Sequence, residues 1–198
     1  MTTRRLPSRV IVIGTSAGGV PALLQLVQGL PEDLDAAVHI VLHVGANPSL
    51  LPELLGVRCR WRVVHARNAE VPAAGSIYVA PPDHHLLLEP QQLQLNRGPK
   101  ENHARPAIDP LFRSAALNWG PRVIGVILTG QLDDGAAGLQ AIQECGGITV
   151  VQDPATAAQP AMPRAALAAV VEPGACVGIQ EMGATLAGLG GHGEQARP

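Results

Sequence analysis

The stretch from Val10 to Ala22 constrains the fold more than any other part of the sequence. An apolar, β-branched run stops at Gly14, and after one serine and two glycines helix-forming sequence begins. Residues 14–18 read Gly-Thr-Ser-Ala-Gly, the form of a nucleophile elbow, in which a tight turn between a strand and a helix lifts one side chain above the sheet edge. We expect a strained turn with no room for a Cβ beside Ser16, and helix N-terminal N–H groups that bind a developing oxyanion.

Three other interpretations of this turn compete with the elbow. A dinucleotide-binding fingerprint needs a glycine where Ser16 stands and an acidic residue at the end of the second strand, whereas Asp33 and Asp35 precede that strand. A P-loop needs a lysine after its second glycine, and Gly19 is followed by Val20. Both phosphate-binding interpretations are therefore disfavoured. The third, in which Ser16 only caps the helix, stays open because serine is a favoured N-cap residue.

Composition favours a single α/β domain built on aliphatic residues. The 198 residues are 46% apolar but only 2% aromatic, so Val, Ile, Leu and Ala must fill the core, as in buried parallel strands covered by helices. We expect one domain over residues 1–189 and a Gly-rich, disordered tail over 190–198. The scarcity of aromatic residues disfavours a base-stacking surface, and the formal charge of -2 gives no electrostatic reason to bind nucleic acid or an anionic membrane.

The N-terminal sequence and the cysteines indicate a cytoplasmic protein with reduced thiols. The apolar run before Gly14 is too short for a signal peptide or a membrane span, which predicts no membrane insertion. Cys59, Cys145 and Cys176 are odd in number and far apart, so we interpret them as reduced packing residues. The seven histidines show no HExxH or other metal-ligand spacing, so neither a metal nor a cofactor is predicted.

The hydrophobic periodicity predicts strands that alternate with helices. This alternation is typical of a three-layer α/β/α, doubly wound fold with a mostly parallel sheet. The stretch from 61 to 95 carries four short strands between Pro, Gly and Gln turns, which we interpret as an antiparallel excursion. A helix from Asp109 is opened by Asp-Pro, a natural N-cap and N1 pair. Strands are expected over residues 10–14, 36–42, 61–66, 76–80, 86–89, 92–95, 123–128 and 148–151, and helices over 19–29, 49–55, 109–119, 136–144, 162–169 and 180–189.

Three polar side chains each follow an apolar strand. Ser16 follows the first strand, His43 follows the second, and Asp134 lies in the polar turn after the strand at 123–128. Parallel strands end at a common edge, so this edge can bring a nucleophile, a base and an orienting carboxylate together. The order Ser, His, Asp differs from the Ser, Asp, His order of α/β-hydrolases and argues against that family. Asp133 competes for the carboxylate role, and either aspartate could instead cap the following helix.

Several separated motifs, in order along the chain, resemble one known family. They are Val-Ile-Gly-Thr-Ser-Ala-Gly-Gly at 12–19, the strand ending in His43, Ile-Tyr-Val-Ala-Pro at 77–81 with His84 or His85 beyond it, Arg-Pro-Ala-Ile-Asp at 105–109 before Leu111-Phe112, Gly-Val-Ile-Leu-Thr-Gly at 125–130, Asp-Gly-Ala-Ala-Gly at 134–138, and Met-Pro at 162–163. From about residue 10 to 171, the chain resembles the catalytic domain of the chemotaxis protein-glutamate methylesterases, the CheB family. Each motif alone is unspecific, but their combination disfavours the helix-cap interpretation of Ser16.

The resemblance implies hydrolysis of γ-glutamyl methyl esters on the cytoplasmic helices of chemoreceptors, with deamidation of receptor glutamines as a related activity. It makes Ser16 the nucleophile and His43 the base, and it favours Asp134 because this residue precedes the Gly-Ala pair as the family's aspartate does. The oxyanion is implied to bind the backbone N–H of Ala17 and, from the later turn, that of Gln131. Family members usually carry an N-terminal receiver domain, and we expect this chain to hold the catalytic module alone.

One turn departs from the family pattern. The family generally has Met-Gly after Thr-Gly, where this chain has Gln131-Leu132, and leucine adopts a positive φ less easily than glycine. We therefore expect a rebuilt turn in which the second oxyanion donor is displaced. A receptor-binding signalling module without turnover and a small-molecule esterase remain alternatives to the methylesterase.

The remaining polar candidates are assigned from their surroundings in the sequence. His103 with Arg105 is a candidate substrate groove, because a receptor surface carrying glutamates is acidic and guanidinium pairs well with carboxylate. His39 lies within a strand and is expected to be a hydrogen-bonded core residue. His84 and His85 follow two prolines and an aspartate and are expected to be solvated loop residues, with a place at the rim of the site as the alternative.

Overall fold

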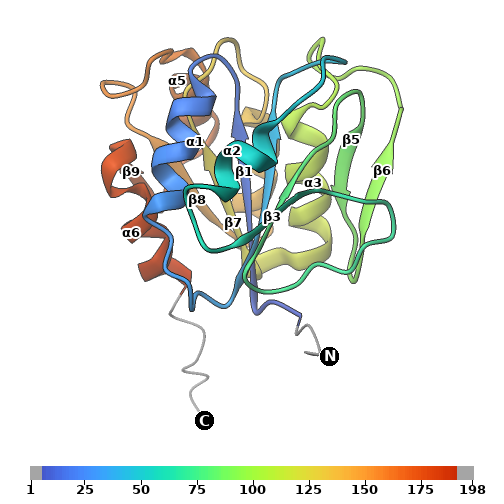
Figure 1. Cartoon of the computed structure of the whole chain (residues 1–198). Helices are drawn as coiled ribbons and strands as arrows, with labels where there is room; N and C mark the ends of the chain where they lie inside the picture. The colour runs from blue at the N-terminus through green and yellow to red at the C-terminus, as the bar shows by residue number, and fades with distance from the viewer. Residues whose placement is uncertain (1–5, 191–198) are drawn as a thin grey trace.

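Seven parallel strands form the central sheet of the computed structural model, which describes residues 6–190 (Figure 1). The strand order is β3-β4-β2-β1-β7-β8-β9, and a separate hairpin pairs β5 with β6. The strands are β1 (Arg9–Thr15), β2 (Ala36–Leu42), β3 (Arg62–His65), β4 (Ser76–Val79), β5 (His85–Leu88), β6 (Leu93–Asn96), β7 (Val123–Ile127), β8 (Ile148–Gln152) and β9 (Ala175–Val177). The helices are α1 (Gly19–Gln28), α2 (Leu51–Gly56), α3 (Ile108–Trp119), α4 (Ala136–Glu144), α5 (Ala161–Ala169) and α6 (Ile179–Gly190), with a 3-10 turn at Gly120–Arg122.

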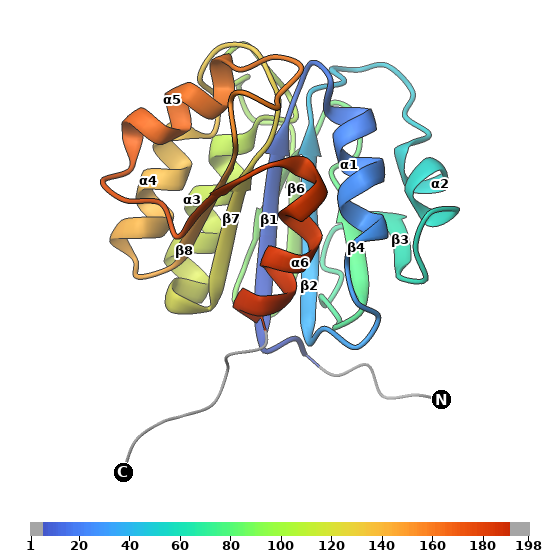
Figure 2. The same ribbon diagram turned by 90° about the vertical axis from the view of Figure 1, so that its left-hand side faces the viewer.

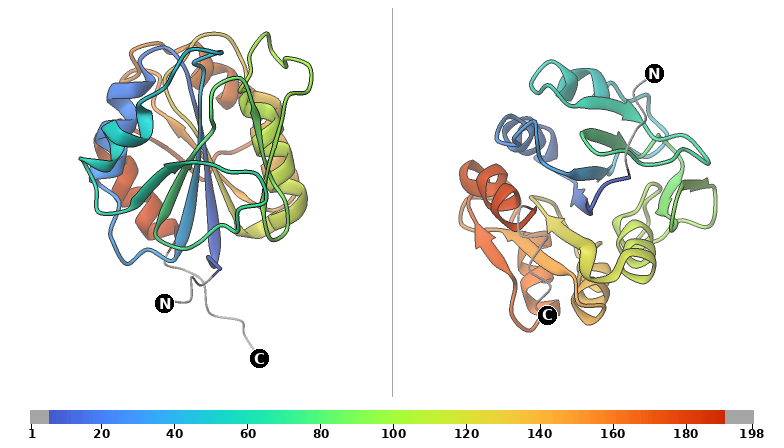
Figure 3. Two further views of the ribbon diagram at one scale, coloured as in Figure 1. Left: turned by 45° about the vertical axis from the view of Figure 1, so that its right-hand side comes forward. Right: turned by 90° about the horizontal axis from the view of Figure 1, so that it is seen from below.

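Helices cover both faces of the sheet. Figure 2 and the view from below in Figure 3 show α1, α2 and α6 on one face and α3, α4 and α5 on the other, with the hairpin beside α3. Each face has its own cluster of buried side chains, because alternate residues of a strand point to opposite sides. On β1, Val10 and Val12 join the α3 side, whereas Ile11 and Ile13 join the α1 side. The predicted three-layer α/β/α fold with a mostly parallel sheet is confirmed.

The antiparallel excursion is shorter than expected. β3 pairs with β4 in parallel and β4 pairs with β2 in parallel, so the first two of the four short strands belong to the central sheet. The connection over residues 66–75 carries the chain back along the sheet before β4 begins, and the two strands therefore run in the same direction. Among the strands of residues 6–190, β5 and β6 alone pair antiparallel. The edge strand β9 is absent from the sequence-based expectations because three residues carry too little periodicity.

Most element boundaries differ from the expected ones by one or two residues, and two of these differences change an interpretation. The sequence predicts a tail from residue 190, but Gly190 is the last residue of α6, and residues 191–198 lie outside the described part of the chain. The helix expected from Asp109 begins at Ile108 with Ala107 as its N-cap, so Asp109 lies inside the first turn and is not the cap. Within residues 6–190, no helix combines the length and apolarity needed to cross a membrane.

The three strands that precede the polar candidates are neighbours at the centre of the sheet. β1 lies between β2 and β7, with Thr15 paired to Leu42 and Gly14 paired to Ile127. The chain leaves all three strands at the upper edge in Figure 1, directly after these paired residues. This edge, formed by the carboxyl ends of parallel strands, is where open α/β sheets bind their ligands.

Candidate active site

The turn between β1 and α1 places Ser16 at the upper edge of the sheet. The Ser16 N–H donates to the Thr129 carbonyl at 3.1 Å, and the Ser16 carbonyl accepts the Gly19 N–H at 2.9 Å. The left-handed residue of the turn is Gly18, with a φ of 79°, and not the serine. Gly18 is also the N-cap of α1, without a side-chain capping bond, so Ser16 is not a helix cap.

Packing against neighbouring segments explains the two elbow glycines. A Cβ at Gly14 would lie 2.8 Å from Ile108 Cδ1, and a Cβ at Gly18 would lie 2.8 Å from the Ala158 Cβ. Both distances are shorter than real Cβ contacts, so neither position accepts a side chain. As expected, no Cβ fits at the glycines that flank Ser16. The cause is close packing against neighbouring segments rather than backbone strain at Ser16 itself.

Ser16, His43 and Asp134 form a continuous chain of hydrogen bonds. The His43 ring lies with Nδ1 3.2 Å from Ser16 Oγ and with Nε2 2.7 Å from Asp134 Oδ2. Turning the ring over would direct carbon atoms at both partners, so the geometry settles which nitrogen faces which residue. The structure thus brings these three sequence-predicted residues together.

The Asp134 carboxylate determines which nitrogen of His43 carries the hydrogen. An ionised carboxylate only accepts hydrogen bonds, so Nε2 is the donor and Nδ1 keeps a lone pair toward the Ser16 hydroxyl. Burial by itself raises the pKa of Asp134, but hydrogen bonds from His43, the Ile108 N–H and Asn102 outweigh it, and the resulting pKa lies below its usual value. Asp134 is therefore ionised at neutral pH and holds the ring in the tautomer that accepts a proton from serine.

Asp134 and Asp109 cap two neighbouring helices. Asp134 caps α3, the helix that contains Asp109, and Asp109 caps α4, the helix that follows Asp134. Asp134 precedes α4, yet its carboxylate accepts the N–H groups of Ile108 at 2.7 Å and Asp109 at 3.1 Å, at the start of α3. Asp109 in α3 accepts the N–H groups of Gly135 at 3.1 Å and Gly138 at 2.7 Å, at the start of α4. Helix N-termini stabilise negative charge, so the two caps hold both carboxylates in place.

Asn102 belongs to this site, although no sequence motif predicts it. Its side-chain nitrogen lies 2.6 Å from Asp134 Oδ1 and 2.8 Å from Asp109 Oδ2. The sequence offers one weak signal for it, a place three residues before the Arg105-Pro106 motif. Asp133, by contrast, is exposed, and its carboxylate makes no hydrogen bond to any residue from 6 to 190. Asp134 is therefore the carboxylate that contacts His43.

Two backbone N–H groups near Ser16, those of Ala17 and Gln131, donate to no group in the described part of the chain. Gly130 lies against the serine, since a Cβ at Gly130 would be 3.1 Å from the Ser16 Cβ, so the turn that carries Gln131 borders the nucleophile. Leu132 takes the left-handed φ, here 64°, that motivates the expected displacement of the second oxyanion donor, yet Gln131 still lines the same pocket as Ser16. The turn accommodates the leucine at a cost of about 1 kcal/mol in backbone strain.

A pocket of about 260 Å³ opens over the triad residues. It is lined by Ser16, His43, Asn102, His103 and residues 131–134. His103, one of the two groove candidates, therefore faces the space that a substrate would occupy.

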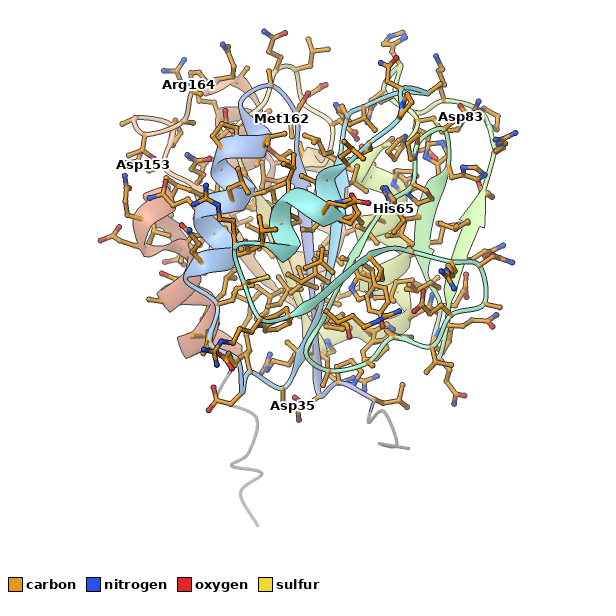
Figure 4. The ribbon with its side chains drawn as sticks, viewed as in Figure 1. Asp35, His65, Asp83, Asp153, Met162 and Arg164 are labelled. Atoms are coloured by element: carbon orange, nitrogen blue, oxygen red, sulfur yellow. The ribbon has the colours of Figure 1, made fainter. Side chains whose placement is uncertain are left out.

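Arg105, the other groove candidate, does not line this pocket. Its guanidinium donates to Asp83 Oδ1 at 2.6 and 2.9 Å and to the Gly98 carbonyl at 2.8 Å, and 20% of the side chain is exposed. The hydrogen bond from Arg105 lowers the pKa of the Asp83 carboxyl. Asp83 lies at the upper corner beside the hairpin in Figure 4, so Arg105 ties this loop to the hairpin. This placement gives no support to a role in a substrate groove.

Other polar candidates lie apart from the triad. His85 is buried in β5 with Nε2 2.9 Å from the Pro99 carbonyl, which corrects its expected place in a solvated loop. Cys145 and Cys176 are exposed, so of the three cysteines only Cys59 packs against the core. Among residues 6–190, no group of three or more His, Cys, Asp or Glu side chains could hold a metal ion.

The fold and the site together define a class of protein. A parallel α/β sheet that presents a hydroxyl, an imidazole and a buried carboxylate in hydrogen-bonded order at its carboxyl edge has the architecture of a serine hydrolase. The family model described as CheB methylesterase matches residues 11–186. The chain belongs to this family.

Named relatives and one solved structure agree with this assignment. A putative protein-glutamate methylesterase/protein-glutamine glutaminase of Leptospira interrogans is 42% identical over 161 residues, which cover 80% of this chain and 83% of that protein. The protein-glutamate methylesterase/protein-glutamine glutaminase of Mesorhizobium japonicum is 40% identical over 81% of this chain but only 48% of its own length. The crystal structure of the Thermotoga maritima CheB methylesterase catalytic domain matches with a TM-score of 0.86 at 28% identity, covering 91% of this chain and 98% of that one.

Proposed function

We propose that this protein is a protein-glutamate methylesterase that hydrolyses γ-methyl esters on the cytoplasmic helices of chemoreceptors, with glutamine deamidation as a second reaction. The hydrogen-bonded series Ser16, His43, Asp134 carries this proposal, because it supplies the nucleophile and the base that acyl transfer needs. Family membership and the names of the relatives support the choice of substrate. The proposed substrate requires the protein to act in the cytoplasm.

The proposed reaction has two halves. Ser16 Oγ attacks the ester carbonyl carbon while His43 Nδ1 takes the hydroxyl proton. The tetrahedral intermediate collapses as the imidazolium returns this proton to the departing methoxide, which leaves methanol and a glutamyl ester on the serine. Water then attacks this ester while Nδ1 takes its proton, and the imidazolium returns that proton to the departing Ser16 oxygen, which gives free glutamate and the original serine. The Ala17 and Gln131 N–H groups are the proposed donors to the oxyanion of both intermediates.

Asp134 has a supporting part in both halves. Its carboxylate keeps the hydrogen on Nε2 before the attack and stabilises the imidazolium after it. Only 2% of the Asp134 side chain is exposed, so water screens this interaction weakly.

Methanol release from receptor membranes carrying methylated glutamates tests the proposal. We expect S16A to release no methanol above background. In D134N we expect the rate of methanol release to fall by about 10³- to 10⁴-fold while the fold stays intact. S49A is the matched control, since Ser49 does not line the pocket, and it is expected to keep wild-type activity. A serine-directed phosphonate should label the wild type at Ser16 and leave S16A unlabelled.

Two outcomes would favour the alternatives. Receptor binding by well-folded wild-type protein without methanol release or phosphonate labelling would indicate a signalling module without turnover. Hydrolysis of p-nitrophenyl esters without any action on receptor membranes would indicate a small-molecule esterase. Either result would contradict the proposed function.

A further inference from the structure

One side-chain amide connects the two buried carboxylates that cap α3 and α4. Asn102 Nδ2 lies 2.6 Å from Asp134 Oδ1 and 2.8 Å from Asp109 Oδ2. An amide nitrogen has two hydrogens, one for each carboxylate, and because both partners are acceptors the nitrogen must face them. We propose that Asn102 is a positioning residue, whose amide holds the Asp134 carboxylate in the orientation that contacts His43. The inference rests on the proposed function of the triad.

The two oxygens of Asp134 have different partners. Oδ2 accepts the His43 Nε2–H and the Ile108 N–H, both at 2.7 Å. Oδ1 accepts the Asn102 amide at 2.6 Å and the Asp109 N–H at the longer distance of 3.1 Å. Without the amide, Oδ1 keeps only the longer bond, and the carboxylate is freer to rotate away from the imidazole. Holding Oδ1 therefore holds Oδ2 against His43.

The amide also lies between two like charges. Burial raises the pKa of the Asp109 carboxyl and the nearby charge of Asp134 raises it further, whereas hydrogen bonds from the Gly138 N–H and Asn102 lower it. Two N–H dipoles between the carboxylates reduce their mutual repulsion, and hydrogen bonds to ionised acceptors are the strong ones. Asn102 thus lets Asp134 stay ionised beside a second carboxyl.

The backbone around Asn102 presents the amide from a defined turn. Glu101 and Ala104 exchange backbone hydrogen bonds of 3.2 and 2.8 Å, and Asn102 between them has a φ of 49°. Asparagine tolerates this left-handed conformation better than most residues. An ion pair between Glu101 and Arg113 ties the turn to α3. Both the backbone and the two carboxylates therefore favour asparagine at this position.

Substitution of Asn102 separates positioning from folding. In N102A we expect kcat for methyl-ester hydrolysis to fall by about 10- to 100-fold with KM within about twofold, because the lost bond acts on the triad rather than on the substrate. N102D places a third carboxyl beside two others. Its loss of kcat relative to the wild type is therefore expected to grow as the pH rises and this carboxyl ionises. N102S keeps one hydrogen-bond donor, so its kcat is expected to fall less than that of N102A. If N102A does not fold, the same measurements are made on N102S.

The matched control is E101Q. It removes the ion pair of the same turn and leaves the Asn102 amide in place, so kcat is expected to stay within about twofold of the wild type. A loss in E101Q as large as that in N102A would show that any disturbance of the turn suffices, and would overturn the inference.

A second measurement does not depend on turnover. The hydrogen that His43 Nε2 donates to Asp134 is expected to give a downfield proton resonance in NMR spectra, which in N102A should move upfield or vanish by exchange with water. An unchanged resonance would overturn the positioning role, whether or not kcat falls, because a loss of activity without it belongs to a general structural effect. If the wild type hydrolyses no ester but N102A still alters the resonance, the proposed function fails and the positioning role stands.

Discussion

His39 is a buried histidine whose ring nitrogens have no partner in ordinary hydrogen-bond geometry among residues 6–190. It lies in the middle of β2, and its ring stacks on that of Tyr78 in β4, with centroids 5.4 Å apart and planes inclined by 16°. Desolvation lowers the pKa of His39 to about 3, and the nearby Ile11 backbone opposes this shift only in part. The expectation of a core residue holds, but the contact with the Ile11 backbone lies outside the geometry of an ordinary hydrogen bond. His39 therefore acts as a neutral packing ring.

This histidine makes the free energy of unfolding depend on pH. The unfolded chain binds a proton at His39 below a pH of about 6.5, whereas the folded chain does so only near pH 3, so acid favours unfolding across that window. The cost reaches roughly 3 kcal/mol at pH 4. In urea unfolding at several pH values, we expect H39L to lose less stability between pH 7 and pH 4 than the wild type does, by roughly that amount.

An exposed histidine provides the control for this comparison. H103N is this control, because it replaces a histidine at the surface and leaves the buried His39 in place. Comparing variants also removes the contribution of Asp134, whose lowered pKa makes the protein lose stability as the pH falls through it. Equal pH dependence in H39L and the wild type would contradict the assigned role of His39.

Residues that follow strands are easier to predict from sequence than residues in loops. Ser16 and His43 come directly after an apolar strand and Asp134 lies in the turn that follows one, so the carboxyl edge of a parallel sheet indicates where they meet. Asn102 and Arg105 lie in the connection between β6 and α3, whose path no hydrophobic pattern describes. For this reason the sequence does not reveal Asn102, and it predicts a place in a substrate groove for Arg105, which does not line the pocket at Ser16.

At the level of elements, α3 and α4 depend on each other for their first turns. Asp109 supplies the acceptor for the Gly135 and Gly138 N–H groups of α4. D109A leaves both buried donors unpaired and removes a negative charge from a helix N-terminus. We therefore expect its free energy of unfolding in urea to fall by about 2 kcal/mol, and the amide hydrogen of Gly138 to exchange faster with solvent.

A neighbouring aspartate is the matched control for this prediction. Asp133 is exposed and its carboxylate caps no helix of the described chain, so D133A is expected to change the free energy of unfolding by less than about 0.5 kcal/mol. Equal stability of D109A and D133A would show that the caps observed in the structure contribute nothing to folding.

Hydrophobic periodicity predicts where the long helices and strands lie, but it does not predict which of them contact each other. The Asp-Pro pair predicts a helix start, yet Asp109 serves α4 instead of its own helix, because α4 lies close in space and not in sequence. The same limit explains β3 and β4. Their turn residues are compatible with a hairpin, and only the folded path of residues 66–75 shows that both strands run parallel in the central sheet.

In the whole molecule, the sheet joins two apolar layers, and each layer contains one tryptophan. Trp61 packs in the layer on the α1 side and Trp119 in the layer on the α3 side, with 5% and 4% of their surfaces exposed. Their indole N–H groups donate to the carbonyls of Pro31 and Glu89, both at 3.1 Å. Every strand of the central sheet except the edge strand β9 contributes side chains to both layers, so loss of either layer exposes the other.

The two tryptophans allow a direct test of the prediction that the chain is one cooperative domain. In W61F the remaining fluorescence reports on the α3 side, and in W119F it reports on the α1 side. L23A removes buried contacts on the α1 side only, and we expect it to lower the free energy of unfolding by about 3 kcal/mol in both backgrounds, because the layers share their strands. Urea unfolding followed by fluorescence and by circular dichroism measures this. In W119F the remaining tryptophan, Trp61, shares a layer with Leu23. If L23A lowered the free energy of unfolding only in this background, the layers would unfold separately, which would contradict a single domain.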